Sequence, residues 1–139
     1  MAQTDVLVIG AGVVGAACAY SMARAGLEVT VVDRGPVAGG TTGSGEGNLL
    51  VSDKEPGPEL DLALLSLRLW AELAAEHGVV FEYEPKGGLV VPTTDPALAA
   101  RAGLAARQRA AGVTATAAAP ADLYALEPHL APGLPGGVF

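Results

Sequence analysis

The sequence predicts an α/β fold with a parallel sheet, and three features of residues 6–33 indicate it. Residues 6–9 are an unbroken run of β-branched and aliphatic side chains, as in a strand that helices cover on both faces. A glycine turn at residues 10–15 then leads into an alanine-rich segment with helical spacing. A second apolar run, residues 29–32, ends at an acid, Asp33. This order of strand, turn, helix, strand and acid is typical of a dinucleotide-binding fold.

The three glycines of the turn follow the spacing GxGxxG, and each has a separate physical task. Gly10 allows the tight turn, Gly12 lets a pyrophosphate approach the backbone, and Gly15 lets the helix pack closely on the strand. The first amides of that helix would face the phosphates, because unpaired N–H groups and the helix dipole favour negative charge there.

The segments around the turn support the motif, which would be weak alone in a chain with 19 glycines. Ala19 and Met22 fall at helix-core spacing, and Gly26 lies where a helix would end. Asp33 stands about where a carboxylate reaches a ribose 2′-hydroxyl; the alternative is a solvated strand end. An acid at this position argues against a 2′-phosphate and therefore against NADP.

Composition limits the classes of function. The chain has 139 residues and 50% hydrophobic residues, which is enough for a sizeable core in one domain. Its net charge of -7 leaves no basic surface for a sequence-independent nucleic-acid binder. The single cysteine, Cys18, cannot form an internal disulfide or a cysteine metal site alone, and we expect a buried, inert thiol and no metal.

The N-terminus does not have the pattern of an export signal. Residues 1–5 carry no positive side chain and one acid, and glycines interrupt the apolar run that follows. No run approaches the length of uninterrupted apolar sequence that a membrane span requires. We therefore expect no membrane span and a cytoplasmic protein.

A second glycine-rich stretch, residues 39–48, follows the second predicted strand. One interpretation is a flexible linker. The other is a ligand-binding loop, because Thr41, Thr42 and Ser44 supply hydroxyls and five glycines leave backbone amides uncovered. Its position directly after the predicted ribose-binding strand favours the ligand.

Three stretches together resemble a known family. They are the glycine turn close to the N-terminus, the run of residues 32–35 that contains Asp33 and Arg34, and residues 41–49, where paired threonines lead to Gly47, Asn48 and Leu49. In these stretches the sequence resembles the opening of the D-amino-acid oxidase type of FAD-dependent oxidoreductase. That family includes glycine and sarcosine oxidases and D-amino-acid dehydrogenases.

The resemblance implies FAD as the cofactor and a Rossmann-type FAD-binding domain with a parallel sheet, followed by the start of an incomplete α+β substrate domain. It implies a domain boundary near Gly78, with residues 1–78 in the first domain and 79–139 in the second. Asp33 departs from the glutamate more common in the family, with a shorter reach. The implied cofactor-binding residues are Gly10, Gly12 and Gly15 around the pyrophosphate; Asp33 at the adenosine ribose; Thr41, Thr42 and Ser44 along the phosphates; Gly47, Asn48 and Leu49 nearest the flavin; and Val13, Val14 and Arg34, to which no part of the cofactor is assigned.

The rest of the chain predicts a second series of elements. Gly57 and Pro58 begin a helix that Gly78 ends, with Trp70 in the core and His77 on the surface. The other predicted elements are strands 79–83 and 89–91 around a turn at 85–88, a helix over 97–111 with Arg101, Arg107 and Arg109 as a solvated face, a strand over 113–117 and a helix over 121–126.

The chemistry that the resemblance implies is oxidation of a C–N bond in an amine or amino acid, with hydride transfer to the flavin. No catalytic residue can be assigned, because Tyr83, Tyr124 and His129 have no partner visible in the sequence, and we expect structural roles for them. Residues 138–139 look like the start of a strand left unpaired, so we expect an N-terminal portion whose remaining fold comes from a downstream polypeptide or a partner subunit.

Two functions of other classes stay open. An NAD-dependent dehydrogenase would use the same turn and acid but would not need the loop at residues 39–48. A non-catalytic nucleotide-binding remnant would fit the short length. Visible flavin absorption separates the flavoprotein from both.

Overall fold

The computed structural model describes residues 3–78 and 81–139, and the chain divides into two compact units. The first unit ends at Asn48 and the second begins at Leu49. The domain boundary near Gly78 concerns the FAD-binding and substrate domains, not these two compact units, and it stays a prediction.

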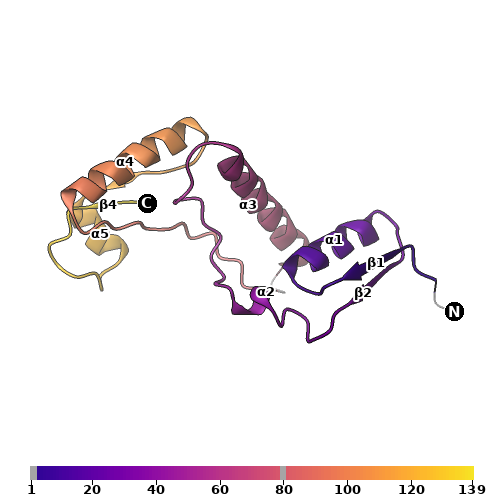
Figure 1. The fold of residues 1–139 in the computed structure, drawn as a ribbon. Helices are drawn as coiled ribbons and strands as arrows, with labels where there is room; N and C mark the ends of the chain where they lie inside the picture. Colours follow the sequence, from indigo (N-terminus) through magenta and orange to yellow (C-terminus); the bar gives the residue numbers. More distant parts are fainter. Residues whose placement is uncertain (1–2, 79–80) are drawn as a thin grey trace. The chain divides into compact units, whose positions relative to one another are not determined.

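The first unit is the predicted strand, helix and strand. β1 (Val6–Ile9) and β2 (Val29–Val32) pair in parallel, with Val6 opposite Val29 and Ile9 opposite Val32, and α1 (Val13–Arg24) connects them (Figure 1). Before the strands, the Glu28 amide donates to the Asp5 carboxylate at 2.9 Å. The α/β class with a parallel sheet is confirmed.

α1 covers one face of this sheet. A Cβ built on Gly15 would lie 3.4 Å from Cγ1 of Val8, so Val8 faces the helix and its neighbours in β1 face the other way. Those neighbours, Leu7 and Ile9, are 54% and 84% exposed. The predicted burial of Cys18 is wrong, because this residue lies on an exposed part of α1.

The second unit contains the helices α3 (Pro58–His77), α4 (Asp95–Ala110) and α5 (Pro120–Leu126). The predicted ends of α3 are confirmed, with Gly78 at a φ of 63° just after the helix. Thr94 caps α4, accepting a hydrogen bond from the Ala97 amide at 3.4 Å.

The second unit also contains a short antiparallel sheet. β3 (Ala117–Ala118) pairs with β4 (Gly137–Val138), and Val90 forms an isolated bridge to Val138. A Cβ on Gly137 would lie 2.8 Å from the Val90 carbonyl oxygen and 2.9 Å from Cδ2 of Leu123, so glycine lets the chain approach a core that contains the fully buried Leu123.

Several predicted strands differ from this arrangement. The strand predicted over 113–117 is shorter and shifted, and the terminal strand predicted to be unpaired is paired on both sides through Val138. Residues 81–83 form no strand, and only Val90 of the 89–91 run pairs. The prediction for residues 79–80 lies outside the described residues. Short segments lack the periodicity that would fix their register in sequence.

The burial of side chains in the second unit agrees only in part with the predictions. Trp70 is half-buried, with its ring edge-on to Phe81 at a centroid distance of 5.7 Å, whereas His77 is exposed as predicted. The solvated face predicted for the α4 arginines is wrong for Arg101, which is half-buried and donates to the Ser52 carbonyl. Among the described residues, no helix combines the length and apolar character needed to cross a bilayer.

Candidate cofactor-binding site

The turn between β1 and α1 has a backbone that only glycine adopts easily. Gly10 has a φ of 112° and donates its amide to the Val32 carbonyl at 2.8 Å, which extends the parallel pairing past the strand ends. A Cβ on Gly15 would overlap the Gly10 carbonyl oxygen. The first and third glycines of the motif are therefore required by the fold of the turn itself.

The N-terminus of α1 leaves amide groups for a ligand. Gly12 is the N-cap, and the first helical hydrogen bond runs from the Ala16 amide to the Gly12 carbonyl at 2.9 Å. The amides before Ala16 are not used by the helix, and the Val13 amide instead donates to the Thr42 hydroxyl oxygen at 3.0 Å. Val14 and Gly15 keep amides at the positive end of the helix dipole, which suits an anion.

Asp33 joins the end of β2 to the turn. One carboxylate oxygen accepts the Ala11 amide at 2.7 Å and the other accepts the Gly35 amide at 2.9 Å. These two hydrogen bonds hold the pKa of Asp33 below its usual value. Because each oxygen has a further acceptor position, the carboxylate can still bind a hydroxyl group.

The glycine-rich stretch after β2, predicted as a linker or a ligand-binding loop, is partly helical. Part of it forms a one-turn helix, α2 (Thr41–Ser44), which follows Gly40. Ala38 has a φ of 58°, unusual for a residue with a side chain, and donates to the Ala11 carbonyl at 3.0 Å. A Cβ on Gly43 would overlap the Ala38 carbonyl oxygen, so this glycine permits the compact turn.

A cavity of about 360 Å³ lies among these elements within the first unit. Five of the predicted residues line it: Gly12, Asp33, Arg34, Thr41 and Thr42. The other predicted residues are not among its lining: Gly10, Val13, Val14, Gly15, Ser44, Gly47, Asn48 and Leu49. Of these, the first four shape or continue the turn, whereas Leu49 belongs to the second unit.

The predicted set of cofactor-binding residues omits several residues at this cavity, although two of them, Gly39 and Gly40, lie in the stretch predicted as a ligand-binding loop. The lining also includes Gly35, Pro36, Gly39 and Gly40, which connect β2 to α2. The Ala11 amide, which holds Asp33, was missed as well. The signal that could have found the first group was the Gly35-Pro36 pair and the Gly39-Gly40 pair that follow Asp33, since such pairs mark turns.

The residues present fit a dinucleotide. The turn offers uncovered amides for a pyrophosphate, a carboxylate with free acceptor positions for a ribose, and hydroxyls from Thr41 and Thr42 at the same cavity. Within residues 3–78 and 81–139, no group of three or more His, Cys, Asp or Glu side chains could hold a metal ion.

Comparison with known proteins gives relatives that match part or nearly all of the chain. D-amino acid dehydrogenase from Dechloromonas aromatica (strain RCB) is 58% identical over 52 residues, which cover 37% of this chain and 12% of that protein. A component of the anaerobic glycerol-3-phosphate dehydrogenase of Escherichia coli (strain K12) is 32% identical over 142 residues, covering 98% of this chain and 25% of that component. The chain thus spans a quarter or less of these relatives.

Solved structures agree with the fold. Glycine oxidase from Bacillus cereus ATCC 14579 superimposes with a TM-score of 0.87 and 26% identity, covering 98% of this chain and 38% of the oxidase. The model of the FAD dependent oxidoreductase family, abbreviated DAO, matches residues 5–139. The D-amino-acid oxidase type resemblance is therefore confirmed, and FAD is the cofactor of the family. This chain belongs to the FAD-dependent oxidoreductase family.

Proposed function

We propose that this chain is the FAD-binding N-terminal portion of an enzyme that oxidises the C–N bond of an amino acid or related amine. The observation that carries the substrate class is the 58% identity to a D-amino acid dehydrogenase. FAD, when bound, supplies the chemistry by accepting a hydride from the carbon beside the nitrogen. This chain's part is to hold and orient that cofactor.

The proposed contacts follow the geometry of the first unit. The amides of Val14 and Gly15 bind the pyrophosphate at the turn that Gly10 and Gly12 open. Asp33, fixed by two backbone amides, accepts hydroxyls of the adenosine ribose, and Arg34 lies beside it at the cavity. The remaining contacts are Thr41, Thr42 and Ser44 along the phosphates and Gly47, Asn48 and Leu49 at the flavin.

The rest of the enzyme belongs to the proposal too. The exposed apolar face of β1, with Leu7 and Ile9, suits coverage by a downstream polypeptide or a partner subunit. We propose that residues 1–78 contribute to the FAD-binding domain, that residues 79–139 begin the substrate domain, and that the protein works in the cytoplasm on a small amine or amino acid.

Cofactor binding is tested by adding FAD to the purified chain and measuring bound flavin by its visible absorption and fluorescence quenching. The wild type should take up FAD, and the double variant Gly12→Ala with Asp33→Ala should not. The Gly12 substitution places a Cβ 3.0 Å from the Thr42 hydroxyl, and the other removes the ribose acceptor. Equal FAD uptake by both proteins contradicts the placement, and a colourless chain that binds NAD supports the dehydrogenase alternative.

Oxidation of a C–O bond is a second candidate, because the glycerol-3-phosphate dehydrogenase component matches 98% of the chain. The complete enzyme to which this chain is proposed to contribute the FAD-binding portion is mixed without oxygen with glycine, a series of D-amino acids and glycerol 3-phosphate, and loss of the visible flavin band is measured. Reduction by amines alone supports C–N oxidation, and reduction by glycerol 3-phosphate alone contradicts it. A complete protein that binds FAD but is reduced by neither fits the non-catalytic alternative.

A further inference from the structure

A tight turn after β2, residues 36–39, forms part of the wall of the cofactor cavity. The Gly39 amide donates to the Pro36 carbonyl at 3.0 Å, which closes the turn, and both residues line the cavity. The Ala38 amide donates to the Ala11 carbonyl at 3.0 Å. This second hydrogen bond joins the turn to the glycine turn that precedes α1.

Ala38 has a backbone conformation that suits glycine. Its φ is 58°, and among the described residues it is the only one other than glycine with a positive φ. In this conformation the Cβ of alanine crowds the following carbonyl oxygen, at a cost in free energy that glycine does not incur. The chain has glycine at the next two positions, 39 and 40, where φ is not positive, and alanine at the position that requires it. Such strained residues persist where surrounding contacts impose them, and they gather at ligand-binding sites.

Contacts on two sides hold the turn against this cost. One is the hydrogen bond to the Ala11 carbonyl. The other is the packing of α2, because a Cβ on Gly43 would overlap the Ala38 carbonyl oxygen. Val37, within the turn, is 79% exposed, so its side chain adds little packing. The closed turn therefore has a limited margin over an open one.

We propose that residues 36–39 are a latch at the cofactor cavity, which opens to admit or release FAD, and that the strain at Ala38 sets how often it opens. The inference rests on the proposed function, which puts the dinucleotide in this cavity. With alanine at residue 38 the closed latch is less stable than with glycine, so the open form is more populated and the cofactor exchanges faster.

The alternative is a fixed cradle, in which the turn stays closed and Ala38 only shapes the wall of the cavity. Ala38→Gly separates the two, because it relieves the strain and lowers the population of the open latch. Ala38→Val acts in the opposite direction, since a β-branched side chain tolerates a positive φ less than alanine does. Ala25→Gly is the matched control: residue 25 ends α1 with a φ of -78°, where glycine relieves no strain, and it does not line the cavity.

The first measurement is amide hydrogen exchange at residue 38, corrected for intrinsic rates, in the complete enzyme to which this chain is proposed to contribute, without FAD. This amide exchanges when its hydrogen bond to the Ala11 carbonyl opens, so its rate reports the opening of the latch. Ala38→Gly should slow the exchange about fivefold, Ala38→Val should accelerate it, and Ala25→Gly should leave it unchanged. An exchange rate that Ala38→Gly does not lower, or that Ala25→Gly lowers equally, overturns the proposal.

The second measurement is the rate of FAD binding and release by the same enzyme, followed by flavin fluorescence after rapid mixing. If FAD passes through the open latch, Ala38→Gly should lower the association and dissociation rate constants together, each about fivefold, and leave the Kd nearly unchanged. A fixed cradle gives either no effect or a slower dissociation alone, and both results overturn the latch. A wild-type enzyme that takes up no FAD overturns the proposed function and the gating of FAD together, while the exchange rates still decide whether Ala38 sets the opening of the turn.

Discussion

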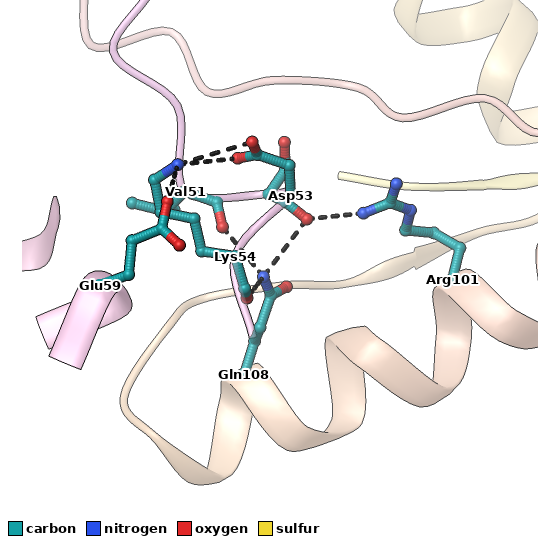
Figure 2. Close-up of polar contacts among 7 residues, drawn as sticks. Val51, Asp53, Lys54, Glu59, Arg101 and Gln108 are labelled. Carbon is teal, nitrogen blue, oxygen red and sulfur yellow. Dashed lines mark hydrogen bonds and ion pairs between the residues drawn. The ribbon is translucent and has the colours of Figure 1, made fainter. Parts of the chain in front are cut away.

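Two stretches of irregular backbone, one in each unit, are held in opposite chemical ways. At the turn of the first unit, side-chain acceptors bind backbone amides: Asp33 binds those of Ala11 and Gly35, and Thr42 binds that of Val13. At residues 51–54 of the second unit, side-chain donors bind backbone carbonyls, with the buried Gln108 contacting three of them and Arg101 one (Figure 2). An acceptor can titrate or share its lone pairs with a ligand, whereas a buried amide donor does neither.

This difference suits what the turn of the first unit is proposed to do. The first unit is proposed to bind a ligand through its remaining amides and carboxylate positions, so its turn must leave some of these groups without a protein partner. At residues 51–54 the donors of Gln108 and Arg101 contact backbone carbonyls and hold the segment. The two kinds of contact should therefore respond differently to substitution and to acid.

The largest expected effect comes from two helical glycines, one in each unit. Gly15→Ala in α1 drives a Cβ into the Gly10 carbonyl, so it should destabilise the first unit by about 3 kcal/mol. Gly103→Ala in α4 is the matched control, because its Cβ would meet only Nη1 of Arg107 at 3.6 Å. Alanine there should stabilise the fold by about 0.5–1 kcal/mol. Urea denaturation of both variants measures these values.

The opposite signs are the essential part of this test. A Gly15→Ala protein with wild-type stability would mean that α1 does not pack on β1 as closely as the structure has it. A destabilised Gly103→Ala protein would show that the cost belongs to alanine in any helix of this chain.

The first unit was largely predictable from sequence, for a physical reason. Its constraints are local: a run of β-branched residues, glycines whose spacing follows the turn, and an acid at the end of the next strand. The one-turn helix α2 escaped prediction, because glycines and small hydroxyl residues have little helical preference and the turn depends on tertiary contacts at Ala38 and Ala11.

The intermediate effect concerns pH and Asp33. Its lowered pKa in the folded chain means that the carboxylate stabilises the turn above its usual pKa, and that this contribution is lost as the pH falls through the lowered value. Amide hydrogen exchange at Ala11 and Gly35, corrected for intrinsic rates, should therefore accelerate in acid. Asp33→Asn should abolish that dependence and weaken FAD binding about tenfold at neutral pH.

The second unit supplies the control for the acid experiment. The Val90 amide donates to the Val138 carbonyl at 2.8 Å with no carboxylate in the contact, so its exchange should follow the intrinsic rate alone. Acceleration at Val90 equal to that at Ala11 would indicate general acid unfolding and would remove Asp33 as the cause.

The second unit was less predictable, because its decisive contacts join residues far apart in sequence. Gln108 and the carbonyls it binds are 54 to 57 residues apart, and no local pattern marks a glutamine that will be buried. The arginines of α4 have the spacing of a solvated face, yet Arg101 reaches a carbonyl and Arg107 forms a two-point ion pair with Glu55. Helix ends were predictable from Gly, Pro and Thr, whereas side-chain partners were not.

The smallest expected effect tests the link between the first unit's turn and α2. Thr42→Val removes the oxygen that accepts the Val13 amide at 3.0 Å, in an exposed position where water replaces much of the bond. The first unit should lose about 0.5 kcal/mol, and FAD affinity should fall only a few-fold. Thr42→Ser keeps the oxygen and should behave as the wild type in urea denaturation and FAD titration. If serine is as damaging as valine, the threonine methyl group matters more than its hydroxyl, and the link between turn and α2 is packing and not a hydrogen bond.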